Sequence, residues 1–148
     1  MSRTNRWTAV VPIVACCIAV GGCEPKGVKA SEATKPAHVE KIEGTSLHTV
    51  TLTSRASERL DIKLAQVEDA VMGGAKRKVV PYGAVLYDAK GDTWVYTSPE
   101  ALVFVRQQIE IDYVSGDRAV LSSGPPAGTK IVTVGAAELF GAEFEIGH

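Results

Sequence analysis

The stretch from Val103 to Tyr113 runs VFVRQQIEIDY, and it is the segment that decides the fold. Apolar side chains recur at every second position of most of this stretch, at Val103, Val105, Ile109, Ile111 and Tyr113. The polar side chains between them belong to Arg106, Gln108, Glu110 and Asp112. Successive side chains of a β-strand point to opposite faces, so this pattern predicts a half-buried strand with one polar face.

Further short strands are predicted on both sides of this stretch. They are Val50–Thr53, Ile62–Val67, Val79–Val80, Ala84–Tyr87, Trp94–Thr97, Ala119–Leu121 and Ile131–Val134. Pro81 has to lie at a strand end or a sheet edge, because proline cannot donate a ladder hydrogen bond. Turn signals recur roughly every 8–12 residues, which is typical of an all-β barrel or sandwich with about seven or eight short strands.

The connections between these strands carry turn chemistry. Asp88-Ala89-Lys90-Gly91-Asp92 predicts a tight hairpin in which Gly91 takes a positive φ. The segment from Glu68 to Lys78 is charged and is interrupted by Gly73-Gly74, so it is interpreted as a linker. One short helix is predicted from Arg55 to Leu60 with Ser54 as its N-cap, and a helical turn from Ala136 to Phe140.

The N-terminus has the layout of a secretory signal with a lipobox. Arg3 and Arg6 precede an apolar run from Trp7 to Val20, and two glycines then precede Cys23. Residues 1–22 are therefore predicted to be a signal peptide, cleaved before Cys23, which would carry the lipid anchor. The expected location is the extracytoplasmic face of the cell envelope, where the lipid holds the protein at a membrane.

Two alternatives to this interpretation stay open. Ile-Val-Ala before Cys16 also fits a loose lipobox, although the apolar run before it is short. The run could instead be an uncleaved anchor, but it contains Pro12 and is shorter than the roughly 20 apolar residues that a spanning helix needs.

The residues after the signal divide into a tether and a domain. Pro, Gly and Ser alternate with Lys and Glu from Glu24 to Thr45 without an apolar period, so residues 23–45 are predicted to be a flexible tether. Residues 46–148 form the predicted β-domain, whose folding signals begin near Leu47. After cleavage no cysteine would remain for an internal disulfide, since Cys16 and Cys17 lie within the signal.

The charge balance argues against a nucleic-acid-binding protein. The chain has 16 basic and 17 acidic residues, a net charge of −1, and no stripe of Lys and Arg.

The sequence also lacks the marks of an enzyme or a metalloprotein. The three histidines, His38, His48 and His148, have neither metal-ligand spacing nor a nucleophile motif beside them, and are interpreted as exposed. Glu110 and Asp112 lie on one strand face, where a solvated polar surface explains them. We therefore expect no catalytic residues, no metal and no cofactor.

Trp94 and Tyr96 point to the same face of their predicted strand. Aromatic side chains of a small β-domain usually belong to its core, because they bury a large area. The alternative is that they line a groove for a small ligand.

Several motifs, taken in order, resemble the membrane-proximal domain of periplasmic adaptor subunits, or membrane fusion proteins, of RND-type efflux pumps. The matching stretches are Leu52–Val67 with Leu60-Asp61-Ile62, Val80–Val85, Gly91 with Trp94–Tyr96, Arg106–Ile109, Val120–Gly124, and Gly128–Val132 with Gly135. In full adaptors an arm of β-barrel, lipoyl domain and α-helical hairpin separates the first of these stretches from the others. Here only Glu68 to Lys78 joins them, and no heptad-bearing stretch is present.

This resemblance implies a non-enzymatic, lipid-anchored β-domain that docks to an inner-membrane RND transporter or to a full-length adaptor. The rival hypothesis is a stand-alone lipoprotein that binds a small molecule or a metal near Trp94 and Tyr96. A third is an envelope structural protein without a specific ligand. A cavity of roughly 300 Å³ or more with convergent polar groups would favour ligand binding.

Overall fold

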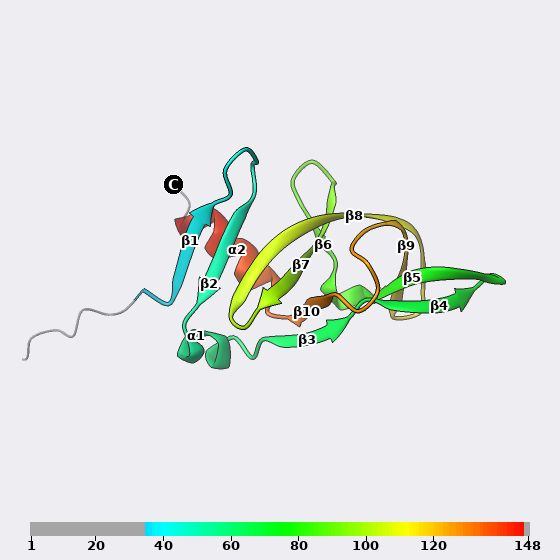
Figure 1. The fold of residues 1–148 in the computed structure, drawn as a ribbon, viewed down its shortest axis with the longest axis horizontal. Helices are drawn as coiled ribbons and strands as arrows, with labels where there is room; N and C mark the ends of the chain where they lie inside the picture. Colours follow the sequence, from blue (N-terminus) through cyan, green and yellow to red (C-terminus); the bar gives the residue numbers. More distant parts are fainter. Residues whose placement is uncertain (1–34, 147–148) are drawn as a thin grey trace, which may run out of the picture. The chain divides into compact units, whose positions relative to one another are not determined.

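Strand β8 (Val103–Ser115) is the centre of the sheet and contacts three other strands. The computed structural model describes residues 35–146, and its strands pair antiparallel throughout this part of the chain. The first half of β8 lies between β7 (Thr93–Glu100) and β2 (His48–Leu52), and its second half pairs with β9 (Arg118–Ser123). Figure 1 shows β8 as a long, strongly curved strand. The predicted small all-β fold is thus confirmed.

The remaining strands extend the sheet from β7, β9 and β2. They are β1 (Ala37–Lys41), β3 (Lys63–Gln66), β4 (Glu68–Met72), β5 (Ala75–Pro81), β6 (Leu86–Tyr87) and β10 (Lys130–Val134). The main path has the order β3-β10-β7-β8-β9-β5-β4, while β1 pairs with β2, and β6 with β7. Pro81 is the last residue of β5, as its chemistry requires.

Two α-helices accompany the sheet within residues 35–146. Helix α1 (Ser54–Arg59) begins one residue earlier than predicted, because Thr53, and not Ser54, is the N-cap: its hydroxyl accepts from the Ala56 amide at 3.2 Å. Helix α2 (Ala136–Ile146) extends the predicted helical turn to 11 residues and contacts β1 and β2. A short 3-10 turn, η1 (Tyr82–Ala84), replaces the start of the strand predicted at Ala84.

The sheet has a hydrophobic core on each face. One core contains Tyr96, Phe104, Val132 and Leu139, and α2 closes it; the other contains Val95, Ile109, Leu121 and Ile131. Neighbouring residues of one strand, such as Val95 and Tyr96, therefore enter different cores. Strands covered on both faces lose the simple alternation of apolar and polar positions.

Strand β1 corrects the prediction of a flexible tether up to Thr45. Its residues pair with β2 in register from Ala37 opposite Leu52 to Lys41 opposite His48, and Ala37 is buried. Paired structure among the described residues therefore begins with β1 at Ala37, upstream of residue 46. The strand is short and mostly exposed, so its sequence carries no apolar period by which it could be recognised.

The segment from Glu68 to Lys78, interpreted as a charged linker, is a β-hairpin. Strand β4 pairs with β5 from Glu68 opposite Val79 to Met72 opposite Ala75. Gly73 and Gly74 have φ of 60° and 83°, the pair of positive values that a type I′ turn requires. Figure 1 shows this hairpin projecting from the rest of the sheet. No helix among residues 35–146 has the length and hydropathy to cross a membrane.

The predicted signal segment, Cys23, the alternative Cys16 and His148 lie outside the described residues.

Candidate functional site

Arg106 and Glu143 form an ion pair inside the domain. Arg106 of β8 is 6% exposed and Glu143 of α2 is 1% exposed, and they are the buried charged side chains among the described residues. Arg106 Nη2 lies 3.2 Å from Glu143 Oε1. This placement corrects the prediction that Arg106 faces solvent with Gln108, Glu110 and Asp112, because α2 covers that face of β8 at its first half.

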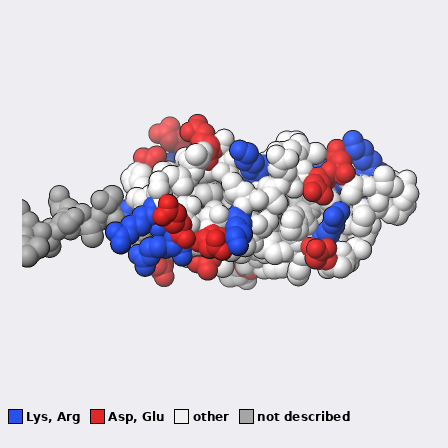
Figure 2. Space-filling view, turned by 90° about the horizontal axis from the view of Figure 1, so that it is seen from below, with Lys and Arg blue, Asp and Glu red and all other residues white. Residues whose placement is uncertain are grey.

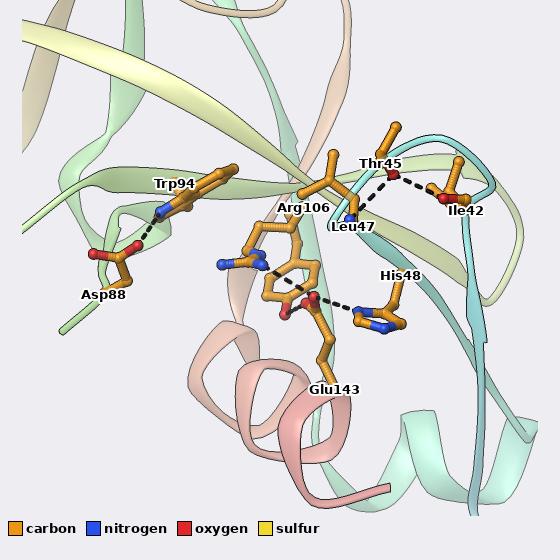
Figure 3. A network of polar contacts seen from close by, with 9 residues as sticks. Ile42, Thr45, Leu47, His48, Asp88, Trp94, Arg106 and Glu143 are labelled. Atoms are coloured by element: carbon orange, nitrogen blue, oxygen red, sulfur yellow. Dashed lines mark hydrogen bonds and ion pairs between the residues drawn. The ribbon is translucent and has the colours of Figure 1, made fainter. Parts of the chain in front are cut away.

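Glu143 has two further partners on other strands. The Tyr96 hydroxyl donates a hydrogen bond to Glu143 Oε2, and His48 Nδ1 lies 3.4 Å from Oε1. Burial, together with the hydrogen bond and the charge of Glu143, raises the pKa of the Tyr96 hydroxyl above its ordinary value. Figure 3 shows Glu143 between Arg106 and His48, so the carboxylate joins α2 to β2, β7 and β8.

Three aromatic rings surround the guanidinium of Arg106. Its Cζ lies 4.3 Å from the ring centroid of Trp94, 5.1 Å from that of Phe144 and 5.7 Å from that of Phe140. The rings of Phe140 and Phe144 contact each other with centroids 4.6 Å apart. Such contacts stabilise a cation, most of all where water is excluded.

The β6–β7 turn fixes the indole of Trp94. Asp88 Oδ2 accepts a hydrogen bond from Trp94 Nε1 at 3.1 Å, and Oδ1 accepts from the amides of Lys90 and Asp92 at 2.9 and 3.0 Å. Desolvation opposes the charge of Asp88, but these hydrogen bonds outweigh it and hold the pKa of the carboxyl below its ordinary value. The predicted Asp88–Asp92 hairpin thus also positions Trp94 (Figure 3).

A cleft of about 620 Å³ opens above these residues. Its lining includes Asp88, Lys90, Trp94, Arg106, Phe140 and Phe144. Gln108 also lines the cleft, opposite Trp94 in the β7–β8 register. The arrangement offers flat apolar walls and a cationic floor, and it contains no paired nucleophile and base among the residues described.

The residues that the sequence singled out lie in different parts of the domain. Tyr96 is a core residue, whereas Trp94 is half-buried and lines the cleft, so the two aromatics predicted together have different roles. His38 is exposed and pairs with Glu40, but His48 is partly buried beside Glu143, which corrects its interpretation as exposed. Glu110 and Asp112 are exposed on the polar surface. Residues 35–146 contain no group of three or more potential metal ligands.

Sequence reasoning missed Glu143, Phe140 and Phe144. One signal for Glu143 was present, because Ala136, Leu139 and Glu143 recur at helical spacing and share one face of α2. No comparable signal linked these residues to Arg106.

The surface charges are mixed in sign. Figure 2 shows acidic and basic side chains near one another on the face drawn, with uncharged surface between them. Exposed pairs such as Lys76 with Asp69, 3.0 Å apart, contribute little to stability.

The sequence matches no protein-family model, and no curated protein is significantly similar to it.

Proposed function

We propose that this chain is a non-enzymatic, lipid-anchored domain that docks to an RND-type efflux transporter, or to its adaptor, on the extracytoplasmic side of a membrane. The proposal rests on the resemblance of its two stretches to the membrane-proximal domain of periplasmic adaptors. One observation carries it further: the two stretches, separated in full adaptors by the arm, share one sheet here.

That observation is the pairing of β3 with β10. Strand β3 comes from the N-terminal stretch and β10 from the C-terminal one, and they pair from Lys130 opposite Gln66 to Val134 opposite Lys63. Gly135, within the C-terminal stretch, packs against Leu60 and Ile62 of the N-terminal one. A domain assembled from both stretches is what the adaptor resemblance requires.

In this proposal the β4–β5 hairpin stands where full adaptors have their arm. Its strands pair from Glu68 opposite Val79 to Met72 opposite Ala75 at one end of the sheet, and a two-residue turn joins them. A domain of this kind has lost the means to reach a distant channel but keeps its own surface for binding a partner at the membrane. Its lipid would raise the local concentration of the domain near that partner.

Site-specific crosslinking tests the docking proposal. Residues 24–148 contain no cysteine, so a single substitution introduces one reactive thiol after cleavage and lipidation at Cys23. We would place it at Glu58 on α1, Val71 on β4 or Glu145 on α2, all exposed. Docking predicts that a thiol crosslinker in whole cells joins some positions, and not others, to an epitope-tagged RND transporter or adaptor of the same organism.

The lipid anchor supplies the matched control. Cys23→Ala should remove palmitate labelling, release the chain from the membrane fraction and abolish the crosslinks, whereas Cys16→Ala should leave all three unchanged. The docking proposal fails if no position crosslinks to a transporter or adaptor. The lipobox assignment fails if the Cys23→Ala chain stays bound to the membrane.

A second function is favoured by the cleft beside Trp94, whose volume of about 620 Å³ lies in the range of small-molecule sites. We propose that the domain binds a small ligand there. The test uses a Trp7→Phe chain, in which Trp94 is the single tryptophan, and follows its fluorescence during titration with small aromatic compounds. Saturable quenching at millimolar concentrations or below is expected, and its absence for all compounds would contradict this function.

A further inference from the structure

The floor of the cleft is a buried cation that has one unpaired hydrogen-bond donor among the described residues. A guanidinium carries five N–H donors, and Glu143 faces the Nη2 end of Arg106. Arg106 Nε is buried and has no hydrogen-bond partner among residues 35–146. Buried donors are normally paired, so an orphaned one beside a cleft indicates a missing acceptor.

The carboxylate of Glu143 pairs with the guanidinium but does not line the cleft. Its other partners, Tyr96 and His48, lie on β7 and β2. Figure 3 shows the guanidinium between Trp94 and Glu143, and Glu143 itself is not among the lining residues. A molecule that enters beside Trp94 therefore meets Arg106 before it meets the carboxylate.

The charges at the mouth of the cleft are mixed in sign, from Asp88, Lys90 and Asp92. Both oxygens of Asp88 accept hydrogen bonds, from Trp94 and from the amides of Lys90 and Asp92. Asp92 and Lys90 are exposed neighbours of opposite charge on the same turn, where water and salt screen them. Of the charged groups that line the cleft, the Arg106 guanidinium is the most deeply buried, and electrostatic interactions are stronger where water is excluded.

The walls of the cleft suit a flat apolar body. Trp94 contributes its ring on one side, and Phe140 and Phe144 contribute theirs from α2. Phe144 is 39% exposed, so it offers apolar surface that a ligand would cover.

We infer that the cleft binds a small organic anion, with its carboxylate or sulfonate accepting hydrogen bonds from Arg106 and its flat apolar body between Trp94 and the phenylalanines of α2. Charge-assisted hydrogen bonds to a guanidinium are roughly twice as strong as neutral ones. This inference rests on the second proposed function, ligand binding in the cleft, and adds the class of ligand.

Three probes with the same ring test the charge preference. Naphthalene-2-sulfonate, 2-naphthylmethylammonium and 2-naphthalenemethanol are titrated into the Trp7→Phe chain while the emission of Trp94 is followed. The sulfonate should bind about ten-fold more tightly than the alcohol, a difference of roughly one charge-assisted interaction, and the ammonium more weakly than both. The advantage of the sulfonate should shrink as salt is raised.

Gln108 offers a matched pair of variants that leave the buried network intact. Its exposed side chain lines the cleft, so Gln108→Lys and Gln108→Glu change the charge without disturbing the core. Gln108→Lys should tighten sulfonate binding and Gln108→Glu should weaken it. Circular dichroism checks that both variants are folded.

The outcomes distinguish the inference of an anionic ligand from the proposed function of ligand binding. If the ammonium binds as tightly as the sulfonate, or if the two Gln108 variants bind the sulfonate equally, the anion inference is overturned while ligand binding stands. If none of the three probes binds, the inference and the second function fall together.

Discussion

The residue that organises the site is Glu143, a carboxylate with three partners in the interior. Moving a charged group out of water is costly, and the cost is offset only where the geometry supplies hydrogen bonds and an opposite charge. Tyr96, His48 and Arg106 supply them from three different strands. The network thus ties the orientation of α2 to the strands beneath it, and this fixes one wall of the cleft.

The ionisation of the Tyr96 hydroxyl can be used to test this network. Because burial and Glu143 raise the pKa of its hydroxyl, Tyr96 should stay protonated in the folded domain at alkaline pH. The chain has four tyrosines, and Tyr82, Tyr87 and Tyr113 are exposed. Absorbance near 295 nm should therefore show a native titration amplitude that is the same in the parent chain and in Tyr96→Phe.

The direction of the stability change follows from linkage. A pKa raised in the folded state favours the protonated form, so the contribution is complete below the unfolded-state pKa of about 10 and is lost as pH rises above it. Alkaline unfolding should expose Tyr96 and add its amplitude to the spectrum. A larger native amplitude in the parent chain than in Tyr96→Phe would contradict the buried hydrogen bond.

The sequence predicts part of this site, and the physical reason for the remainder is distance along the chain. Trp94 and Tyr96 were placed on one strand face because a period of two is local information. The partner of Tyr96, Glu143, is 47 positions away, and no local pattern specifies which face of the sheet a later helix covers. For the same reason Arg106 was predicted to be exposed.

At the scale of elements, the sequence predicts a glycine turn where apolar strand patterns flank it. The hairpin at Gly91 is present, and Gly91 has the predicted positive φ. The β4–β5 hairpin was missed, although Gly73-Gly74 marks it, because no residue of β4 or of the facing stretch from Ala75 to Lys78 is buried. Periodicity predicts strands that have one buried face, and it is silent for strands that have none.

Gly135 joins β10 to α2 and sets the position of the helix. Its φ is +87°, and an added Cβ would overlap Ile62 Cδ1 and lie 3.3 Å from the Leu60 carbonyl oxygen. Gly91 has the same φ of +87°, but nothing lies within 4 Å of its Cβ position. The two glycines therefore separate backbone strain from steric overlap.

Gly135→Ala should destabilise the domain more than Gly91→Ala does. The shared strain costs about 1 kcal/mol, and overpacking at Gly135 adds about 1–3 kcal/mol. Urea unfolding followed by Trp94 fluorescence measures both losses. Ile62→Val, which removes Cδ1, should recover part of the loss at Gly135 and none at Gly91; equal losses in the two alanine variants would show that the junction is not tightly packed.

At the scale of the whole molecule, the domain depends on cores on both faces of one sheet. Strands β7 and β10 contribute neighbouring side chains to each core, so neither core can be lost while the other keeps its strands. We expect the described residues to unfold in one cooperative transition. The strand pattern of the sequence does not specify where this domain begins.

Strand β1 sets the N-terminal boundary of the domain, and N-terminally truncated chains test this. A chain that starts at Lys35 keeps β1, whereas one that starts at Glu43 loses it and with it the buried Ala37 and the partly buried Val39. In the shorter chain β2 also becomes an edge strand, paired with β8 on one side only, and such an edge is prone to pair with other chains.

The Lys35 chain should have the same urea midpoint as a longer chain that starts at Glu24. The free energy of unfolding of the Glu43 chain should be lower by about 2–4 kcal/mol, because apolar side chains leave the core and the ladder hydrogen bonds of one strand are removed. Size-exclusion chromatography should show the Glu43 chain associating. A flexible tether up to Thr45 predicts instead that all three chains have equal stability, so equal midpoints would mean that β1 contributes nothing to the fold. Since Ala37 and Val50 pack in the core that α2 closes, loss of β1 should also weaken the closure of the cleft by α2.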